Sequence, residues 1–279
     1  YTSHVRLTKI LMKFGYHPFK KSVQLSRYEP GHKFEVEEDL SIFSTLQKKL
    51  GLFHREVVSI FQPTQEIIKK LRDIKPFILW TTPSVIHMIA LELERTNSKL
   101  EIPLVLLMAE TLSPNQIDLL KKRVCKHIID VYGCMESPCI GYSYDNSDYK
   151  QIINNSIYVE VLNKRNFNGQ NVGDIVVTNL VNKTMPFIRY SLGDYVGVLD
   201  DKQFPTKRIG RVYGRFDDII NLGDNKTLVF HQTYDMFRNF HECKQYKFIQ
   251  HSNSDLVLQL KILFSFHFFL NLVHLIITE

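Results

Sequence analysis

Between residues 56 and 132 the chain alternates short aliphatic runs with amphipathic segments, and this alternation constrains the fold more than any other feature. The aliphatic runs predict strands at 56–61, 77–80, 102–108 and 127–132. The amphipathic segments predict helices at 64–74, 83–95 and 114–124. Strands that alternate with helices of this length are typical of βαβ units, so we expect an α/β fold with a parallel sheet.

The residues that begin the predicted helices support these assignments. Thr64 stands at the first cap, while Thr82 and Ser113 stand at the next two caps and are each followed by a proline. Another amphipathic segment covers residues 7–14 and stops at Gly15, which predicts a further helix near the start of the chain.

The ends of the predicted parallel strands should share one edge of the sheet. Right-handed crossovers return the chain to the same edge, and ligands of open parallel sheets bind in the crevice beyond the carboxyl ends of the strands. Those ends are WTTPS at 80–84, MAETLS at 108–113 and YGCMES at 132–137. We therefore expect the functional site among these three segments.

The character of the sequence changes near residue 156 to short strands without long helices. Gly-Asp pairs punctuate these strands, as in an antiparallel barrel or meander. We expect a large domain over 1–213, α/β over 1–150 and β-rich over 151–213. The rest, 214–279, is expected to be the start of a small, truncated α+β domain with an apolar tail.

Composition and charge indicate an ordinary globular protein. Apolar residues make up 44% and charged residues 23%, with a net charge of +6. The lysine pairs at 20–21, 48–49, 69–70 and 121–122 are spread along the chain, and the last three fall in helix-like segments. Solvated helix faces explain them better than a nucleic-acid surface does, so we expect no nucleic-acid partner.

The four cysteines do not form a recognisable metal or redox motif. They stand at 125, 134, 139 and 243, without CxxC spacing and without a histidine pair to complete a zinc site. A metal knuckle or redox pair at 134 and 139 is therefore disfavoured. Free thiols indicate a reducing compartment, and we expect a cytoplasmic protein.

The two termini give further expectations. The chain starts at Tyr1 without a signal-peptide pattern, which suggests a processed product or a fragment. The apolar stretch at 262–277 is interrupted by His267, Asn271 and His274. A core element or an abnormal tail fits it better than a membrane anchor. Nothing in the sequence fixes the oligomeric state, and a homodimer stays open.

Four motifs in order suggest a specific chemistry: MAET at 108–111, VYGCME at 131–136, PFIRYSLGDYV at 186–196 and GRFDDIINL at 214–222. In order and spacing they resemble the later core motifs of the adenylate-forming enzymes. TPS at 82–84 and the late YKFIQ and DLVLQL segments look most like the phenylacetate-CoA ligase branch, which includes capsule-biosynthesis relatives. The resemblance implies a ligase that uses ATP and Mg²⁺ to convert a small-molecule carboxylate into acyl-AMP, and then transfers the acyl group to coenzyme A.

The resemblance also assigns roles to individual residues. Tyr132 would stack on adenine, and the backbone of Ala109 and Glu110 would line the base pocket. The loop after Tyr132 would complete the nucleotide site; its residues are Gly133, Cys134 and Met135. The strand that ends at Tyr132 thus leads directly into the predicted site.

Charged residues would bind the rest of the nucleotide. Glu136 would hold Mg²⁺ near the α-phosphate, although alone it also suits a solvated loop acid. Asp194 would accept hydrogen bonds from both ribose hydroxyls, the alternative being a turn aspartate after Gly193. Arg215 would contact the nucleotide as a planar donor, and Asp217 would be the hinge.

An acyl pocket is expected at an earlier strand end. Trp80, Thr81 and Thr82 would border it, with a core tryptophan as the competing interpretation.

The sequence departs from the family pattern in three ways. No Ser/Thr/Gly-rich phosphate loop is found, Met135 replaces a threonine, and the late lysines at 244, 247 and 261 do not match the catalytic lysine. Such a loop and lysine supply much of the charge stabilisation in catalysis. We therefore expect this polypeptide alone to activate carboxylates poorly. A degenerate protein that binds AMP or an adenylate for sensing or interaction is the alternative.

Overall fold

The computed structural model describes most of the chain in segments. These are residues 2–27, 52–53, 55–110, 112–145, 147–153, 156–167, 170–199, 205–215, 219–223, 226–228, 243–252, 255–262 and 273–276. The chain divides into two compact units that interleave along the sequence. Unit 1 comprises 1–159, 177–188 and 203–209, and unit 2 comprises 160–176, 189–202 and 210–279. The domain limits that we expect near 150 and 213 remain predictions.

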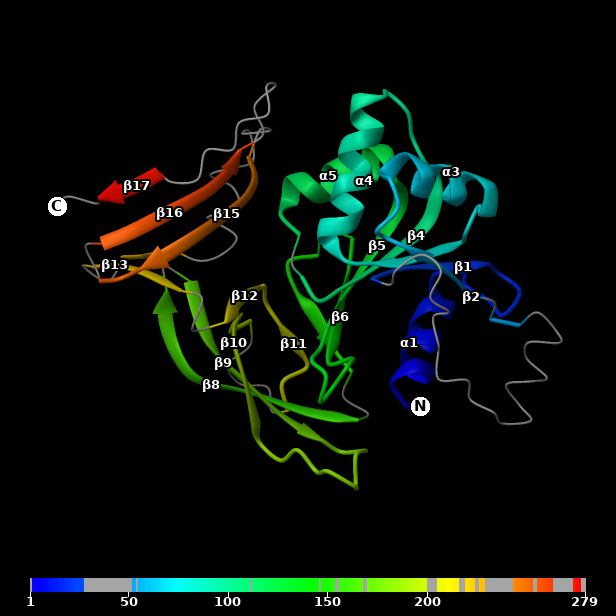
Figure 1. Cartoon of the computed structure of the whole chain (residues 1–279). Coiled ribbons are helices and arrows are strands. Elements are labelled where there is room, and N and C mark those ends of the chain that lie inside the picture. The colour runs from blue at the N-terminus through cyan, green and yellow to red at the C-terminus, as the bar shows by residue number, and fades with distance from the viewer. Residues whose placement is uncertain are drawn as a thin grey trace. The chain divides into compact units, whose positions relative to one another are not determined.

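Unit 1 contains an eight-stranded sheet in the order β11-β7-β6-β5-β4-β3-β1-β2 (Figure 1). Five neighbouring strands are parallel: β2 (Arg55–Ser59), β1 (Ser22–Ser26), β3 (Ile78–Thr81), β4 (Ile102–Met108) and β5 (Cys125–Tyr132). Three antiparallel strands extend the sheet beyond β5: β6 (Gly141–Tyr144), β7 (Lys150–Ile152) and β11 (Arg208–Ile209). The predicted parallel βαβ region is confirmed.

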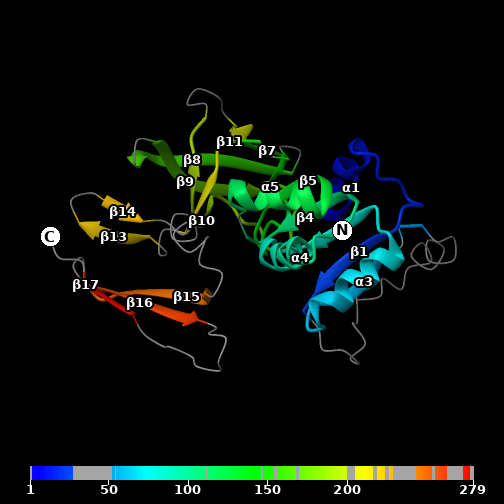
Figure 2. The same cartoon turned by 90° about the horizontal axis from the view of Figure 1, so that it is seen from above.

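Helices cover both faces of this sheet. They are α1 (Thr2–Lys13), α3 (Thr64–Ile74), α4 (Pro83–Arg95) and α5 (Pro114–Arg123). Figure 1 shows α3, α4 and α5 on one side and α1 on the other, and Figure 2 gives the view from above. The predicted cap at Ser113 is confirmed, because its hydroxyl accepts from the Gln116 N–H and its own N–H donates to Gln116 Oε1. The prediction of Thr64 as a cap is wrong: Pro63 holds that position, and Thr64 is the first helical residue.

The strands of the sheet bury side chains on both faces, as their continuous apolar runs require. Leu79, Val105 and Ile128 pack in one cluster with the buried faces of α3 to α5. Ile78, Leu106 and other alternate residues of the same strands pack in a second cluster with α1. A sheet buried in this way leaves its strand ends, rather than its faces, available for ligands.

Unit 2 is built from strands. A four-stranded sheet has the order β12-β10-β9-β8. Its strands are β8 (Ile157–Phe167), β9 (Gln170–Asn179), β10 (Tyr190–Gly197) and β12 (Val212–Arg215), of which β8 and β9 also extend into unit 1. This confirms the β-rich region that we expect after residue 156.

The described part beyond residue 214 also consists of strands. β13 (Ile220–Gly223) pairs with β14 (Lys226–Leu228), and β16 (Asp255–Ile262) lies between β15 (Cys243–Gln250) and β17 (Val273–Ile276). The described residues of this module include no helix, so its predicted helical part remains a prediction. Residues 273–276 of the apolar tail are thus part of a sheet. Within the described segments, no helix is long and apolar enough to span a bilayer.

Candidate functional site

The predicted ligand edge of unit 1 is formed by the carboxyl ends of β3, β4 and β5. These strands are parallel neighbours, so Thr81, Met108 and Tyr132 end at the same edge of the sheet. Tyr132 is the last residue of β5 and is partly buried. The segments that follow these strands contain most of the residues that the sequence predicts for the site.

The loop after β5 is folded tightly on itself. The Cys134 N–H donates to the Ser137 carbonyl at 3.0 Å, and the Ser137 N–H donates back to the Cys134 carbonyl at 3.2 Å. A Cβ added at Gly133 would lie 2.4 Å from the Pro138 carbonyl oxygen, so only glycine fits there without a shift. The Met135 side chain is 93% exposed. The loop backbone is therefore fixed while one apolar side chain is left in solvent.

Glu136 is partly buried at the end of this turn, and a residue from a distant segment supports it. The Asn179 side-chain amide donates to the Glu136 carbonyl oxygen and to Ser137 Oγ, both at 3.1 Å. The Asn179 side-chain oxygen accepts from the backbone N–H groups of Val181 and Asn182. Sequence reasoning missed Asn179, whose only signal was an asparagine at the end of a strand.

Cys134 is a free, partly buried thiol. Burial, together with a hydrogen bond to Glu136, raises the pKa of this thiol to about 11. Cys125 and Cys139 are free thiols as well. Among the described residues, no three His, Cys, Asp or Glu side chains gather closely enough to hold a metal ion.

Glu136 suits the kind of metal site that a nucleotide brings with it. Mg²⁺ is usually held by one or two protein carboxylates together with substrate phosphates and water. A single, partly buried carboxylate on a backbone-fixed turn matches the protein share of such a site. The residues present therefore fit Mg²⁺ bound with a nucleotide.

Glu110 has a structural partner that the sequence did not reveal. Its carboxylate accepts from the Ser84 N–H at 2.8 Å and from the Ser84 hydroxyl at 2.9 Å. Thr82, the cap residue of α4, makes no side-chain cap hydrogen bond, so Glu110 takes over this role from the segment that follows β4. Ala109 lies between β4 and Glu110 with a φ of +75°, an unusual value for a residue with a side chain.

Trp80 and Thr81 lie in the buried core. They are 6% and 4% exposed, and the Arg55 guanidinium lies 4.2 Å above the centre of the Trp80 ring system. This agrees with the core interpretation of Trp80. Nevertheless Trp80 Nε1 and Thr81 Oγ1 have no hydrogen-bond partner among the described residues. The role of these residues and Thr82 in an acyl pocket remains a prediction.

Unit 2 places the two remaining predicted nucleotide residues side by side. Asp194 of β10 and Arg215 of β12 are register partners in an antiparallel pair. The preceding residues, Gly193 and Gly214, have φ values of +75° and +103°. Directly opposite residues in such a pair have Cβ atoms about 4.5–5.5 Å apart. Two strands that are separate in the sequence thus bring a carboxylate and a guanidinium next to each other.

The predicted site residues therefore form two groups, one on each unit. Unit 1 has the turn from Tyr132 to Glu136 and the Glu110 segment, and unit 2 has Asp194 and Arg215. Asp217, the predicted hinge residue, lies outside the described residues.

Comparison with known proteins adds an independent test of the sequence resemblance. No family model matches the chain. A phenylacetate-coenzyme A ligase from Pseudomonas putida is 27% identical over 167 residues, which are 56% of this chain and 38% of that protein. The chain thus matches well under half the length of this curated relative.

Solved structures support the fold over a longer part of the chain. One is a 2-hydroxyisobutyryl-CoA ligase in the postadenylation state, in complex with R3-HIB-AMP. It has a TM-score of 0.62 and 15% identity, and covers 91% of this chain and 56% of the ligase. Another is an O-succinylbenzoate coenzyme A synthetase from Bacillus subtilis in complex with AMP. Its TM-score is 0.60 at 13% identity, over 93% of this chain and 54% of the synthetase. The chain is thus similar in sequence to a phenylacetate-coenzyme A ligase over 56% of its length, and it shares the fold of these two solved ligase structures.

Proposed function

We propose that this chain provides the nucleotide-binding surfaces of an ATP-dependent ligase that activates a small carboxylate and passes it to coenzyme A. The pairing of Asp194 with Arg215 in the β10–β12 register supports this proposal most directly. The two residues come from separate sequence motifs, and an acid beside a planar cation suits a ribose phosphate. The relationship to phenylacetate-CoA ligases points to the same chemistry.

In this proposal each group has a defined task. Tyr132 stacks on adenine, the Asp194 carboxylate accepts from the ribose hydroxyls, and Arg215 donates to the phosphate. A carboxylate oxygen of the substrate attacks the α-phosphorus of ATP, pyrophosphate leaves, and the thiol of coenzyme A then displaces AMP from the acyl carbon. Glu136 would hold Mg²⁺, which would neutralise negative charge on the phosphates when bound.

AMP binding tests the central assignment. Asp194→Asn keeps the size of the side chain but removes a charge-assisted acceptor, so we expect AMP affinity measured by calorimetry to fall about tenfold or more. Asp118→Asn makes the same change at an exposed position on α5 and should leave the affinity unchanged. Equal affinities of both variants and the original chain, or no AMP binding at all, would contradict the proposal.

A protein that binds AMP without turnover is the second candidate. The observation in its favour is Met135, which is 93% exposed at the position where the family resemblance expects a hydroxyl. Exchange of labelled pyrophosphate into ATP in the presence of phenylacetate separates the two functions. Exchange supports the ligase, and AMP binding without exchange supports the second candidate.

A further inference from the structure

A cavity of about 710 Å³ opens at the amino edge of the parallel sheet, opposite the edge of the candidate site. Its walls come from the segments that lead into β1, β3 and β4 and from the end of α3. All of these segments belong to unit 1. A volume of this size suits a small organic ligand, for which protein pockets measure about 300–1,000 Å³.

Cationic side chains dominate the rim of this amino-edge cavity. Five of them line it, namely Lys20, Lys21, Arg72, Lys75 and Lys99, together with the single carboxylate of Glu101. Glu101 pairs with Lys99 at 2.8 Å in solvent. Among the described residues, no ion pair joins the other four cations to a carboxylate. The cavity is therefore strongly positive.

The interior of the amino-edge cavity is apolar. Leu71, Pro76, Leu100 and Ile102 line it and are all buried in the fold. Phe77 adds an aromatic surface, and the Lys20 ammonium lies 5.2 Å from the centre of its ring. An apolar interior with a cationic rim recognises a molecule that joins a hydrophobic body to an anionic head.

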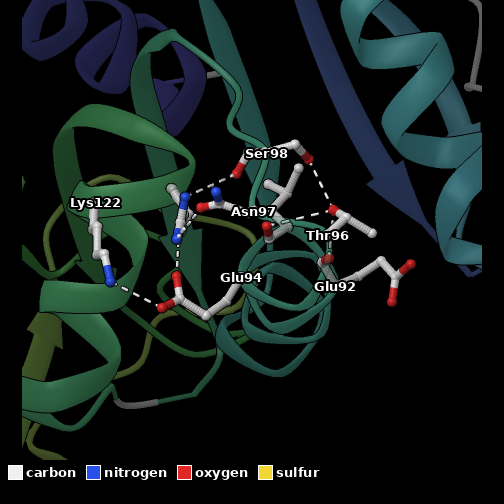
Figure 3. A network of polar contacts seen from close by, with 8 residues as sticks. Glu92, Glu94, Thr96, Asn97, Ser98 and Lys122 are labelled. Atoms are coloured by element: carbon white, nitrogen blue, oxygen red, sulfur yellow. Dashed lines mark hydrogen bonds and ion pairs between the residues drawn. The ribbon is translucent and has the colours of Figure 1, made fainter.

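A hydrogen-bond network holds one side of the rim in place. An Arg72 N–H donates to Ser98 Oγ at 3.1 Å, and Ser98 Oγ also lies 2.9 Å from Thr96 Oγ1. Figure 3 shows the neighbouring contacts, in which Ser98 Oγ faces Thr96 Oγ1 and the Lys122 ammonium pairs with the Glu94 carboxylate. Because the partner of Arg72 is a neutral hydroxyl, this contact positions the guanidinium and leaves its positive charge uncompensated. A preorganised cation of this kind favours anion binding.

We propose that the amino-edge cavity binds a small organophosphate with an aromatic or aliphatic body. A phosphomonoester carries up to two negative charges near neutral pH and has several acceptor oxygens, so it can use several lysines at once. A monocarboxylate would leave most of the rim without a counter-charge. The cavity is separate from the candidate nucleotide residues of unit 1, since it lies at the other end of the same strands.

Calorimetry on the full chain tests this proposal with 1-naphthyl phosphate as the probe. Inorganic phosphate and 1-naphthol represent its head and its body, and each should bind at least tenfold more weakly than the complete probe. Lys75→Glu should weaken binding of the probe at least tenfold. Lys69→Glu reverses the same charge on an exposed position of α3 outside the cavity, and it should change the affinity less than twofold.

Two further variants make the outcome unambiguous. Lys21→Glu alters the rim from another segment and should cause the same loss of affinity as Lys75→Glu. If circular dichroism shows that one of the two variants folds poorly, the other still tests the proposal. Asp194→Asn should leave naphthyl phosphate binding unchanged, because the probe does not use the candidate nucleotide residues. The proposal is overturned if naphthol binds as tightly as its phosphate, if the probe does not bind, or if Lys69→Glu weakens binding as much as Lys75→Glu.

Discussion

The two edges of the parallel sheet in unit 1 are chemically opposite. The carboxyl edge presents the acids Glu110 and Glu136, whereas the amino edge presents the cations around the cavity. The helix direction explains much of this difference. Helices begin at the carboxyl edge, where their N-termini favour negative charge, and end at the amino edge, where their C-termini favour positive charge. One topology thereby creates an acidic edge and a basic edge.

Specific contacts follow this rule on both edges. Glu110 accepts a hydrogen bond from a backbone N–H in the first turn of α4. At the other edge, Arg72 lies in the last turn of α3, and Lys122 and Arg123 lie in the last turn of α5. The functional proposals therefore assign different partners to the two edges: a nucleotide whose phosphates carry Mg²⁺ at the acidic edge, and an organophosphate without a metal ion at the basic edge.

The largest effect on stability is expected beside the acidic edge. The buried Lys150 ammonium donates to Asp130 of β5 and to Ser143 Oγ, so Lys150→Ala leaves the partly buried Asp130 carboxylate without this partner. We expect a loss of about 3 kcal/mol in the free energy of unfolding, at the lower end for broken buried pairs. Denaturant unfolding measures it, and Lys126→Ala at an exposed position of β5 serves as the control. Similar stabilities of both variants would show that the ion pair is dispensable.

A matched pair of glutamates compares the two edges directly. Glu110→Ala removes the acceptor of the Ser84 N–H, and a lost helix cap costs about 1 kcal/mol. Glu101→Ala at the basic edge removes only a solvent-exposed ion pair with Lys99 and should cause no measurable loss. Thermal or denaturant unfolding measures the loss of stability of each variant. An equal loss for both glutamates would refute the difference that we assign to them.

The smallest effect is expected at the corner of the amino-edge cavity. Ser98→Ala removes the acceptor of the Arg72 guanidinium in an exposed network, which should cost about 0.5 kcal/mol. The double variant with Glu110→Ala should be additive within about 0.5 kcal/mol, because the two contacts lie at opposite ends of the sheet. A larger interaction free energy in denaturant unfolding would mean that the two edges are coupled.

The sequence predicted the regular elements well where the pattern was local. The helices over 64–74 and 83–95 and the strand over 102–108 have the predicted bounds. Strand β1 was not assigned, because SVQLS is short and alternates polar with apolar residues. Its place in the sheet depends on pairing with β2 and β3, which follow much later in the chain.

The candidate site was predictable where its residues are contiguous. The turn from Tyr132 to Glu136 could be placed at a strand end from the sequence alone, and its binding role remains a prediction. Asn179 and the contact of Glu110 with Ser84 depend on segments far apart in the chain, so no local pattern indicated them. The amino-edge cavity was missed for the same reason, since its cations come from three segments and each one suits an ordinary solvated lysine.

The position of β1 has a consequence for the integrity of unit 1. In the described sheet β2 is the terminal strand, and β1 is its only neighbour. Removing residues 1–27 would therefore not trim a peripheral extension. It would take out an interior strand, separate β2 from β3, and expose the backbone hydrogen-bonding groups of both.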